Sequence, residues 1–440
     1  MNLDDMIMIS IDDHVVEPPD VFARHMPERF KDRVPKLIND VEGTGRGVGG
    51  RAPSRYAVGI DRWVFQDQSI GVPGIGAVMS WPHEEWSSDP ANLSEMRPGA
   101  YDARERVRDM NANGTLASMN FPTFPGFSAT HLARMPDREL TNFTLSAYND
   151  WLIDEWAASA PGRFLPMSVV PFFDVEASVA EIHRVAKKGS LAVTLPETPY
   201  GIGAPDFASG YWDPIFEALC DTGQVACLHI GGAYGLLQRP EGTPIDDVLM
   251  LCPQLTAVAC NDILLSGRLR MFPQLRFALS EGGIGWIPFF LDRFENVVRH
   301  NASWARAEQL PPGKTATEIF REHFMACFIT DPSTLRLRDR IGIESIAWEC
   351  DYPHSDSRWP RSPEMLLEEL EAAACTDAEI DAITWKNVAR FFRFDPFAHI
   401  AKEDATVGAL RARAKADGVD TSTTSRNEFR RRWEVAHANV

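Results

Sequence analysis

Residues 6–19, MIMISIDDHVVEPP, decide how the rest of this chain is interpreted. The first six, residues 6–11, are apolar and rich in β-branched side chains, which is typical of a short buried strand. Two carboxylates and an imidazole follow at once. Because side chains alternate along a strand, Asp12 and His14 can point to the same side where the strand ends. The stretch therefore predicts half of a divalent-metal site, although a strand that runs into a polar turn gives the same pattern.

Length and charge restrict the classes of protein that the chain can be. With 440 residues, of which 44% are hydrophobic, it can bury a large core, either as one long α/β barrel or as two to three smaller domains. The formal net charge of −18 argues against binding to nucleic acid or to an anionic membrane surface. We therefore expect a small-molecule substrate, with no nucleic-acid partner and no membrane partner.

Targeting signals and cysteine usage both favour the cytoplasm. The N-terminus, MNLDDMIMIS, is acidic and lacks the basic segment and long apolar core of a signal peptide. No apolar stretch approaches the ~20 residues that a membrane-spanning helix needs. The seven cysteines form no C-x-x-C pair, and several lie in apolar runs. This pattern predicts buried free thiols in a reducing compartment.

Strand-like and helical runs alternate through most of the chain. A strand, a helix and a further strand recur with turn signals between them, which favours a parallel (β/α)₈ TIM barrel over an open sheet. We assign this α/β barrel to residues 1–400. Eight runs have the character of strands: residues 6–11, 115–120, 164–170, 191–195, 225–228, 275–279, 325–329 and 345–348.

Two segments depart from the alternation. Residues 41–97 lose clear periodicity, and the glycine-rich part at 42–50 lacks the Lys-Ser/Thr ending of a phosphate loop, so we expect an inserted, lid-like loop after the first strand. Residues 401–440 are polar and form a C-terminal helical extension with a basic run, Arg430 to Arg432. This run is either a solvated helix face or a contact with a second subunit of a homodimer.

The insertion also carries several aromatic side chains. Aromatic residues on a long loop usually hold the loop against the core, and less often they form the wall of a substrate pocket. The residues concerned are Trp63, Phe65, Trp81, His83 and Trp86.

Polar side chains follow four of the predicted strands. In a (β/α)₈ barrel these strand ends meet at one mouth, where active sites form. Two imidazoles and two carboxylates there suit Zn²⁺, Mn²⁺ or Fe²⁺. The predicted ligands are Asp12 and His14 after the first strand, His229 after the fifth and Asp351 after the eighth.

Two further side chains lie at the same mouth, and each candidate also has a plainer interpretation. Glu281 follows the sixth strand and His354 lies three residues beyond Asp351, so either can carry a proton for a reaction at the metal. Alternatively, His229 is a core histidine, Glu281 caps the next helix, and Asp351 forms a turn before Pro353.

The chain resembles the amidohydrolase-2 branch of the amidohydrolase superfamily, metal-dependent TIM-barrel enzymes that include aminocarboxymuconate-semialdehyde decarboxylase. The resemblance covers roughly residues 6–395. The motifs that carry it are Asp12-x-His14-x-x-Glu17-Pro18, Lys188-Gly189-Ser190, Trp212-Asp213-Pro214, His229-Ile230-Gly231, Ser280-Glu281-Gly282-Gly283, Asp351-Tyr352-Pro353-His354 and Asn387-Val388-Ala389-Arg390.

The resemblance implies metal ligation by the first-strand pair, His229 and Asp351, and two positions depart from it. The decarboxylase has His-x-His where this chain has Asp12-x-His14. The family histidine that shuttles a proton is replaced by Glu281, so its role passes to Glu281 or to His354. We expect one divalent ion, with Zn²⁺ as the first candidate. Oxygen ligands shift the preference towards Mn²⁺.

Three functions are consistent with these residues. The first is hydrolysis of an amide, lactone or ester of a small, partly apolar molecule, in which metal-activated water attacks, Asp351 takes the proton and Glu281 or His354 assists the leaving group. The second is non-oxidative decarboxylation of an aromatic or unsaturated acid. The third is a barrel that binds without catalysing, which the intact set of ligand side chains disfavours.

Overall fold

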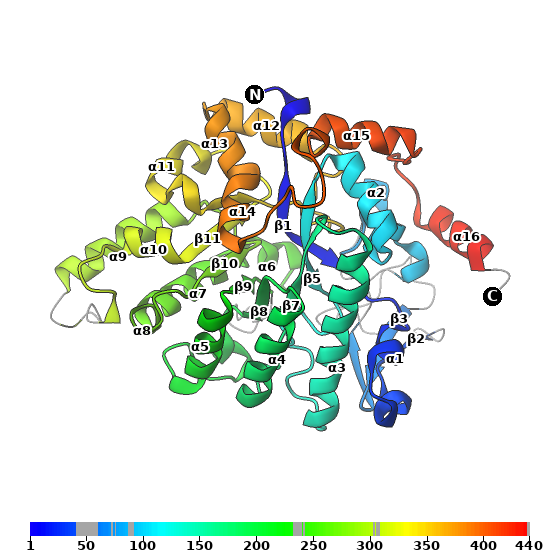
Figure 1. Cartoon of the computed structure of the whole chain (residues 1–440), viewed down its shortest axis with the longest axis horizontal. Helices are drawn as coiled ribbons and strands as arrows, with labels where there is room; N and C mark the ends of the chain where they lie inside the picture. Colours follow the sequence, from blue (N-terminus) through cyan, green and yellow to red (C-terminus); the bar gives the residue numbers. More distant parts are fainter. Residues whose placement is uncertain are drawn as a thin grey trace.

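The structure is a computed structural model that describes residues 1–40, 60–71, 74, 76–86, 92–231, 240, 243–301, 304 and 309–437. The glycine-rich segment 42–50 lies outside these residues. Within them, parallel strands occupy the centre and helices surround them, as Figure 1 shows.

Eight strand positions form the predicted barrel. They are β1 (Ile9–Val15), β5 (Ala117–Pro122), β6 (Phe164–Leu165) with β7 (Met167–Val169), β8 (Ala192–Pro196), β9 (Val225–His229), β10 (Phe277–Ser280), β11 (Phe324–Phe328) and β12 (Ile346–Trp348). All pairings among them are parallel, in the orders β1-β5-β6 and β7-β8-β9-β10-β11-β12.

Two features join these sheets into one barrel. The first is that β6 of one sheet and β7 of the other are halves of a single strand position. They are separated only by Pro166, which has no N–H to donate. On the other side, Asp351 N–H donates to the Asp12 carbonyl at 2.8 Å and His14 N–H donates to the Tyr352 carbonyl at 2.7 Å. These bonds fasten β1 to the segment just beyond β12. The (β/α)₈ prediction is therefore confirmed.

The position of the first strand corrects the sequence prediction. The sequence predicts a strand over residues 6–11 with the polar residues after it, but β1 spans Ile9–Val15 and contains them. Asp12 and His14 are fully buried, so the strand continues through side chains that periodicity treats as a turn. The strand persists because β5 supplies a parallel partner as far as Val15.

The helices cover the outside of the barrel. Several begin at an aspartate whose side chain accepts from the first-turn N–H groups, as Asp102, Asp137 and Asp174 do. In chain order the helices are α1 (Val21–His25), α2 (Ala103–Asn113), α3 (Arg138–Trp151), α4 (Val175–Lys187), α5 (Asp213–Thr222), α6 (Ile245–Leu251), α7 (Gln254–Leu265), α8 (Arg268–Met271), α9 (Ile287–His300), α10 (Ala316–His323), α11 (Arg338–Ile341), α12 (Ser362–Ala372), α13 (Asp377–Asp381), α14 (Asn387–Phe392), α15 (Val407–Ala416) and α16 (Arg426–His437).

The insertion after β1 contains a small sheet that the sequence pattern does not predict. Strands β2 (Lys36–Asp40), β3 (Ile60–Phe65) and β4 (Gln68–Gly71) pair antiparallel. Trp63 and Phe65 of β3 are buried, and the Trp63 ring lies 4.8 Å from that of Phe124. These aromatic side chains therefore hold the insertion against the barrel. The strands are too short, and too interrupted by polar residues, to give a clear period.

The C-terminal helix α16 is anchored to the same insertion by buried charges. The Glu95 carboxylate accepts from Arg426 Nη2 at 2.9 Å and from Arg430 Nε at 2.7 Å, and Glu95 is 1% exposed. The Arg426 guanidinium also lies 4.6 Å from the centre of the Trp81 ring. We call Glu95, Arg426 and Arg430 the tail clamp. Arg430 is therefore not part of a solvated basic face.

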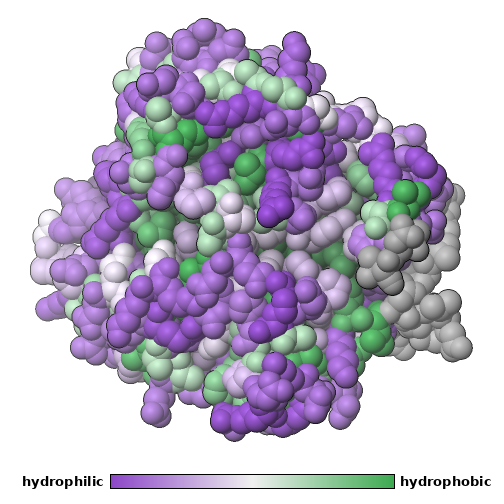
Figure 2. Space-filling model, turned by 45° about the vertical axis from the view of Figure 1, so that its right-hand side comes forward, coloured by the Kyte–Doolittle hydropathy of each residue, from purple (hydrophilic) through white to green (hydrophobic). Residues whose placement is uncertain are grey.

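One helical stretch requires a correction of the membrane prediction. Asp247–Leu265, 19 residues long, is apolar enough to cross a membrane by length and composition. It consists of α6 and α7 with Cys252 and Pro253 between them, and Leu255, Ala259 and Ile263 of α7 are buried against the barrel. Of its most apolar 18 residues 39% are buried, and Leu249 and Met250 of α6 are exposed, so only part of the stretch packs into the core. Figure 2 shows a largely hydrophilic face with scattered hydrophobic patches.

Candidate metal centre

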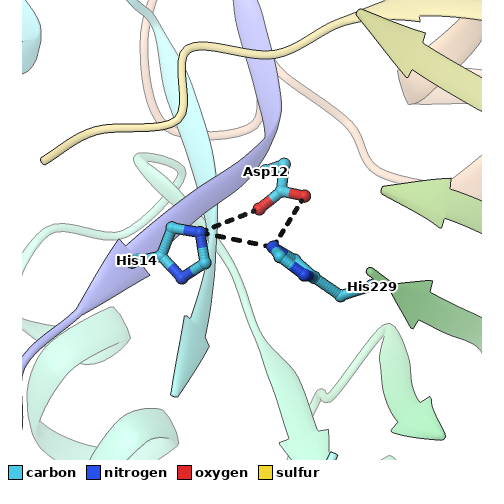
Figure 3. A group of neighbouring side chains, drawn as sticks. All are labelled: Asp12, His14 and His229. Atoms are coloured by element: carbon cyan, nitrogen blue, oxygen red, sulfur yellow. Dashed lines mark hydrogen bonds and ion pairs between the residues drawn. The ribbon is translucent and has the colours of Figure 1, made fainter. Parts of the chain in front are cut away.

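Four side chains from three distant segments of the sequence meet at the barrel mouth. His14 Nε2 lies 3.6 Å from Asp12 Oδ1, 3.1 Å from Asp351 Oδ1 and 3.3 Å from His229 Nε2. His229 Nε2 lies 3.4 Å from Asp12 Oδ2. Figure 3 shows Asp12, His14 and His229 converging from β1 and β9. The structure thus brings together all four predicted metal ligands.

Strand β1 presents Asp12 and His14 through a local irregularity. Its register with β5 shifts between Ser10 and Asp13, so that two residues of β1 oppose one of β5, as in a β-bulge. Asp13 takes a different role from its neighbours, because its carboxylate accepts from the Ser10 hydroxyl at 2.9 Å and faces Arg106 at 3.9 Å. Asp13 is therefore a structural carboxylate, whereas Asp12 and His14 face the imidazole of His229.

His229 is oriented by its own backbone. Its Nδ1 lies 2.5 Å from the Ile230 carbonyl oxygen, which can only accept a hydrogen bond. The proton of the neutral ring therefore resides on Nδ1, and the lone pair of Nε2 points at the cluster. Burial, together with the neighbouring His354, lowers the pKa of His14 well below its ordinary value. Neutral imidazoles are the form that binds metal ions.

The two carboxylates lie beside imidazole nitrogens but form no hydrogen bond in good geometry. Asp12 and Asp351 are 0% and 1% exposed, and none of their four oxygens has a hydrogen bond in good geometry among the described residues. A buried carboxylate without partners costs several kcal/mol. A divalent cation held by these oxygens and the imidazole nitrogens would offset that cost. The donor set, two carboxylates and two imidazoles, therefore fits a divalent metal ion.

The pKa shifts of the carboxyl groups in the cluster also indicate a lack of positive charge. Burial and the charge of Asp351 raise the pKa values of Asp12 and Glu281 well above their ordinary range. Burial also opposes ionisation of Asp351, but the imidazoles of His354 and His14 outweigh it and hold the Asp351 pKa below its ordinary range. Several carboxyl groups thus compete for the same positive charge.

Glu281 and His354 form the accessible edge of the cluster. Glu281 Oε2 lies 3.1 Å from His229 Nε2, and His354 Nδ1 lies 3.0 Å from Asp351 Oδ1. The His354 ring is stacked on that of His14, with centroids 3.7 Å apart. The side chains of Glu281 and His354 are 23% and 14% exposed, whereas the other four are at most 1% exposed. Solvent or substrate therefore reaches the cluster at these two groups.

The backbone is strained where the two strand-end carboxylates leave the sheet. Glu281 and Asp351 have φ angles of +56° and +58°, which residues other than glycine rarely adopt. Gly282 follows, and a Cβ there would overlap the side chain of Thr256 on α7. Glu281 does not cap α9, which has no side-chain cap. Its conformation instead turns its carboxylate towards His229.

Other side chains at the site have no clear signal in the sequence. Phe127 lies 4.2 Å from the His229 ring and 4.9 Å from the His14 ring, and Phe121 lies 4.7 Å from His229. These rings form the apolar wall that the loop aromatics Trp63 and Trp81 could have supplied, but both of those are instead buried in the core. Phe121 stands at the end of β5, so attention to every side chain at a strand end, apolar ones included, would have found it.

Glu17 holds two loops together beside the site. Its carboxylate accepts from Thr123 N–H at 3.0 Å and from Phe124 N–H at 2.9 Å, and it is fully buried. It thereby ties the loop after β1 to the loop after β5. The insertion also reaches the site, because Met79 N–H donates to the Pro353 carbonyl at 3.1 Å and Gly76 packs beside the His354 ring.

Comparisons with known proteins identify relatives of this fold. The amidohydrolase family model matches residues 60–394. No curated protein matches the chain.

Eight solved structures that resemble the chain are between 17% and 22% identical to it, so the likeness shows a shared fold. Amidohydrolase map2389c from Mycobacterium avium subsp. paratuberculosis K-10 has a TM-score of 0.66 at 18% identity, covering 88% of this chain and 99% of that one. 5-Carboxyvanillate decarboxylase LigW from Sphingomonas paucimobilis has a TM-score of 0.54 at 22% identity, with coverages of 70% and 88%. The 5-carboxyvanillate decarboxylase from Novosphingobium aromaticivorans DSM 12444, complexed with manganese and 4-hydroxy-3-methoxy-5-nitrobenzoic acid, has a TM-score of 0.57 at 17% identity, with coverages of 89% and 99%.

Proposed function

The chain belongs to the amidohydrolase family, and we propose that it is a metal-dependent hydrolase of an amide, lactone or ester bond in a small, partly apolar molecule. The observation that carries the proposal is the pair of accessible proton-carrying groups, Glu281 beside His229 and His354 beside Asp351. Hydrolysis of a carbonyl-type bond moves two protons, one from water and one to the leaving group. Decarboxylation needs one proton, which is delivered to carbon.

We propose Asp12, His14, His229 and Asp351 as ligands of one divalent ion. Zn²⁺ is the first candidate, with Mn²⁺ and Fe²⁺ as alternatives, and the manganese held by a protein of this fold supports the second. When bound, such an ion supplies Lewis-acid polarisation of a carbonyl oxygen and lowers the pKa of water.

The protein side chains divide the proton transfers between them. Asp351 accepts the proton of the attacking water, and its Oδ1 lies 3.1 Å from His14 Nε2 and 3.0 Å from His354 Nδ1. Glu281, partly exposed at the other edge, donates a proton to the leaving nitrogen or oxygen. Phe127 covers the imidazoles and offers an apolar face to the rest of the substrate.

The second candidate is a decarboxylase of an aromatic or unsaturated acid. It is favoured by the similarity to decarboxylases of 5-carboxyvanillate and 2,6-dihydroxybenzoate. In this reaction Glu281 or His354 protonates the ring carbon, and an ion held by the four proposed ligands would supply Lewis-acid polarisation of the substrate carboxylate. A third candidate, a barrel that binds without catalysing, predicts no stoichiometric metal and no difference in metal content after Asp351→Ala.

One substrate panel separates the first two candidates. The purified protein, reconstituted in turn with Zn²⁺, Mn²⁺ and Fe²⁺, is incubated with amides, lactones and esters and with salicylate-type acids. We expect turnover in the first group, and we expect Glu281→Gln and His354→Asn each to lower kcat by about 10²- to 10⁴-fold. Release of carbon dioxide from the acids, with no turnover of the other compounds, would overturn the hydrolase proposal.

Further proposals concern the organisation and location of the protein. We propose that residues 1–400 act as one barrel domain with a lid over about 41–97, and that 401–440 form a helical extension. We also propose a cytoplasmic homodimer. No two of the described cysteines are joined by a disulfide, which supports a reducing compartment.

A further inference from the structure

A second group of metal-binding side chains lies inside the barrel next to the first. It consists of Cys327 on β11, Glu349 just after β12, and Asp12, which is shared with the first group. One ligand atom from each lies within 4.8 Å of the other two. All three residues are at most 1% exposed. A thiol and two carboxylates are ligand types that Zn²⁺ and Co²⁺ accept together.

The carboxylates of this group, Asp12 and Glu349, have too little positive charge around them. Among the described residues, no lysine or arginine forms an ion pair with Asp12 or Glu349, and both Asp12 oxygens lack a hydrogen bond in good geometry. Asp13, the next residue, differs because Arg106 and two serine hydroxyls surround it. One divalent ion among His14, His229 and Asp351 leaves Glu349 and Cys327 without any cation.

The group is held in place by the strands around it. Glu349 Oε2 accepts from Glu281 N–H at 3.1 Å and from the Cys327 thiol at 2.5 Å. The Cys327 thiol also lies 3.4 Å from the Leu279 carbonyl. Glu349 therefore accepts the hydrogen bond of the thiol and, at the same time, fixes the strained backbone of Glu281. Ligands that are already placed lose little freedom when an ion binds.

We propose that Asp12, Cys327 and Glu349 form a second cation site, for a thiophilic divalent ion such as Zn²⁺ or Co²⁺, with Asp12 shared between the two ions. The proposal rests on the metal-dependent function proposed above, because Asp12 belongs to both sites. Binding exchanges the thiol proton for the ion: the S–H bond breaks, a bond from sulfur to the cation forms, and one proton is released to solvent. Two ions that share a ligand in other enzymes lie ~3.5–4 Å apart.

The test uses the full-length protein, stripped of metal with a chelator and reconstituted with Co²⁺ alone. Cobalt is counted by plasma mass spectrometry, and thiolate ligation is detected as a near-ultraviolet sulfur-to-cobalt charge-transfer band. We expect two equivalents of Co²⁺ and the band in the wild type. Cys327→Ser is expected to retain one equivalent and to lose the band. Glu349→Gln tests the carboxylate ligand, with the same expected loss of one equivalent.

Cys227→Ser is the matched control. Cys227 is also a buried thiol of the barrel interior, on β9, but it is outside the group. This variant should retain two equivalents and the band. Circular dichroism of each variant shows whether it is folded, and if Cys327→Ser does not fold, Cys327→Ala replaces it.

The possible failures are distinguishable. One equivalent in the wild type with no charge-transfer band overturns the second site and leaves the proposed function standing. Two equivalents that persist in Cys327→Ser, or a band lost in Cys227→Ser instead, also overturn the assignment. No bound cobalt in the wild type overturns both the second site and the metal-dependent function.

Discussion

Asp12 and Glu95 are equally hidden from solvent, at 0% and 1% exposure, yet the fold surrounds them in opposite ways. Both oxygens of Glu95 accept from guanidinium groups in the tail clamp. The oxygens of Asp12 lie 3.4 and 3.6 Å from imidazole nitrogens and have no hydrogen bond in good geometry. A buried carboxylate that serves stability is paired within the chain. A buried carboxylate that binds a ligand lacks such partners within the chain, and the ligand supplies them.

The largest expected effect tests the unpaired cluster. Asp351→Asn should reduce turnover by about 10⁴-fold, about 5 kcal/mol of transition-state stabilisation, because it removes both a metal ligand and a proton acceptor. Its free energy of unfolding without metal should fall by about 1–3 kcal/mol, less than for Glu95→Ala below, because Asp351 loses its charged interaction with His14 and His354. Steady-state kinetics and guanidinium unfolding measure the two quantities. Strong destabilisation of the metal-free protein would show that Asp351 is a structural carboxylate.

The tail clamp should respond in the opposite sense. Glu95→Ala leaves Arg426 and Arg430 without their partner, and we expect it to lower the free energy of unfolding by about 3–5 kcal/mol. Its metal content should equal that of the wild type. Glu428→Ala, which removes the partly exposed partner of Arg431 and Arg432, is the control and should cost less than about 1 kcal/mol. Equal losses in the two variants would contradict the role given to the clamp.

Metal removal tests the same contrast between the carboxylate cluster and the tail clamp, because it affects the cluster and leaves the clamp residues unchanged. At free metal concentrations of 100 to 1,000 times the dissociation constant, bound metal stabilises a protein by about 3–4 kcal/mol, and a chelator should remove this amount. Calorimetry of the wild type should show the decrease in melting temperature, while Glu95→Ala should show the same decrease from a lower starting value. Asp12→Ala should not respond to the chelator. An unchanged wild-type melting temperature would argue against a resident metal.

The smallest expected effect concerns a carboxylate satisfied by neutral donors. Glu17→Gln replaces one of the two acceptors for Thr123 and Phe124 N–H by an amide NH₂ and should cost about 1–2 kcal/mol. Metal content should not change, because Glu17 contacts backbone and none of the proposed ligands. Chemical unfolding and metal analysis of the variant, with the exposed Glu28→Gln as control, test this expectation. Loss of metal would show that Glu17 contributes to metal binding.

Much of the fold and of the candidate site could be predicted from local patterns. The alternation of apolar runs and amphipathic segments predicted all eight strand positions, because each run reflects burial on both faces of a parallel strand. The insertion was less predictable, because β2, β3 and β4 are short and pair antiparallel with one another. Their pairing depends on Trp63 and Phe65 packing against the barrel, which no local period reports.

The sequence by itself determined the chemical types of the site. Asp12, His14, His229, Asp351, Glu281 and His354 could be selected because strand ends in a (β/α)₈ barrel meet at one mouth. Only the tertiary structure decided which carboxylates are paired and which are not. Asp12 and Asp13 are adjacent and chemically identical, yet the bulge in β1 directs one to His229 and the other to Ser10 and Arg106. Cys327 and Glu349 likewise meet only because β11 and β12 are neighbours in the closed barrel. The physical reason is that pairing depends on distances of a few ångström between segments far apart in the chain, which barrel closure sets and local sequence does not.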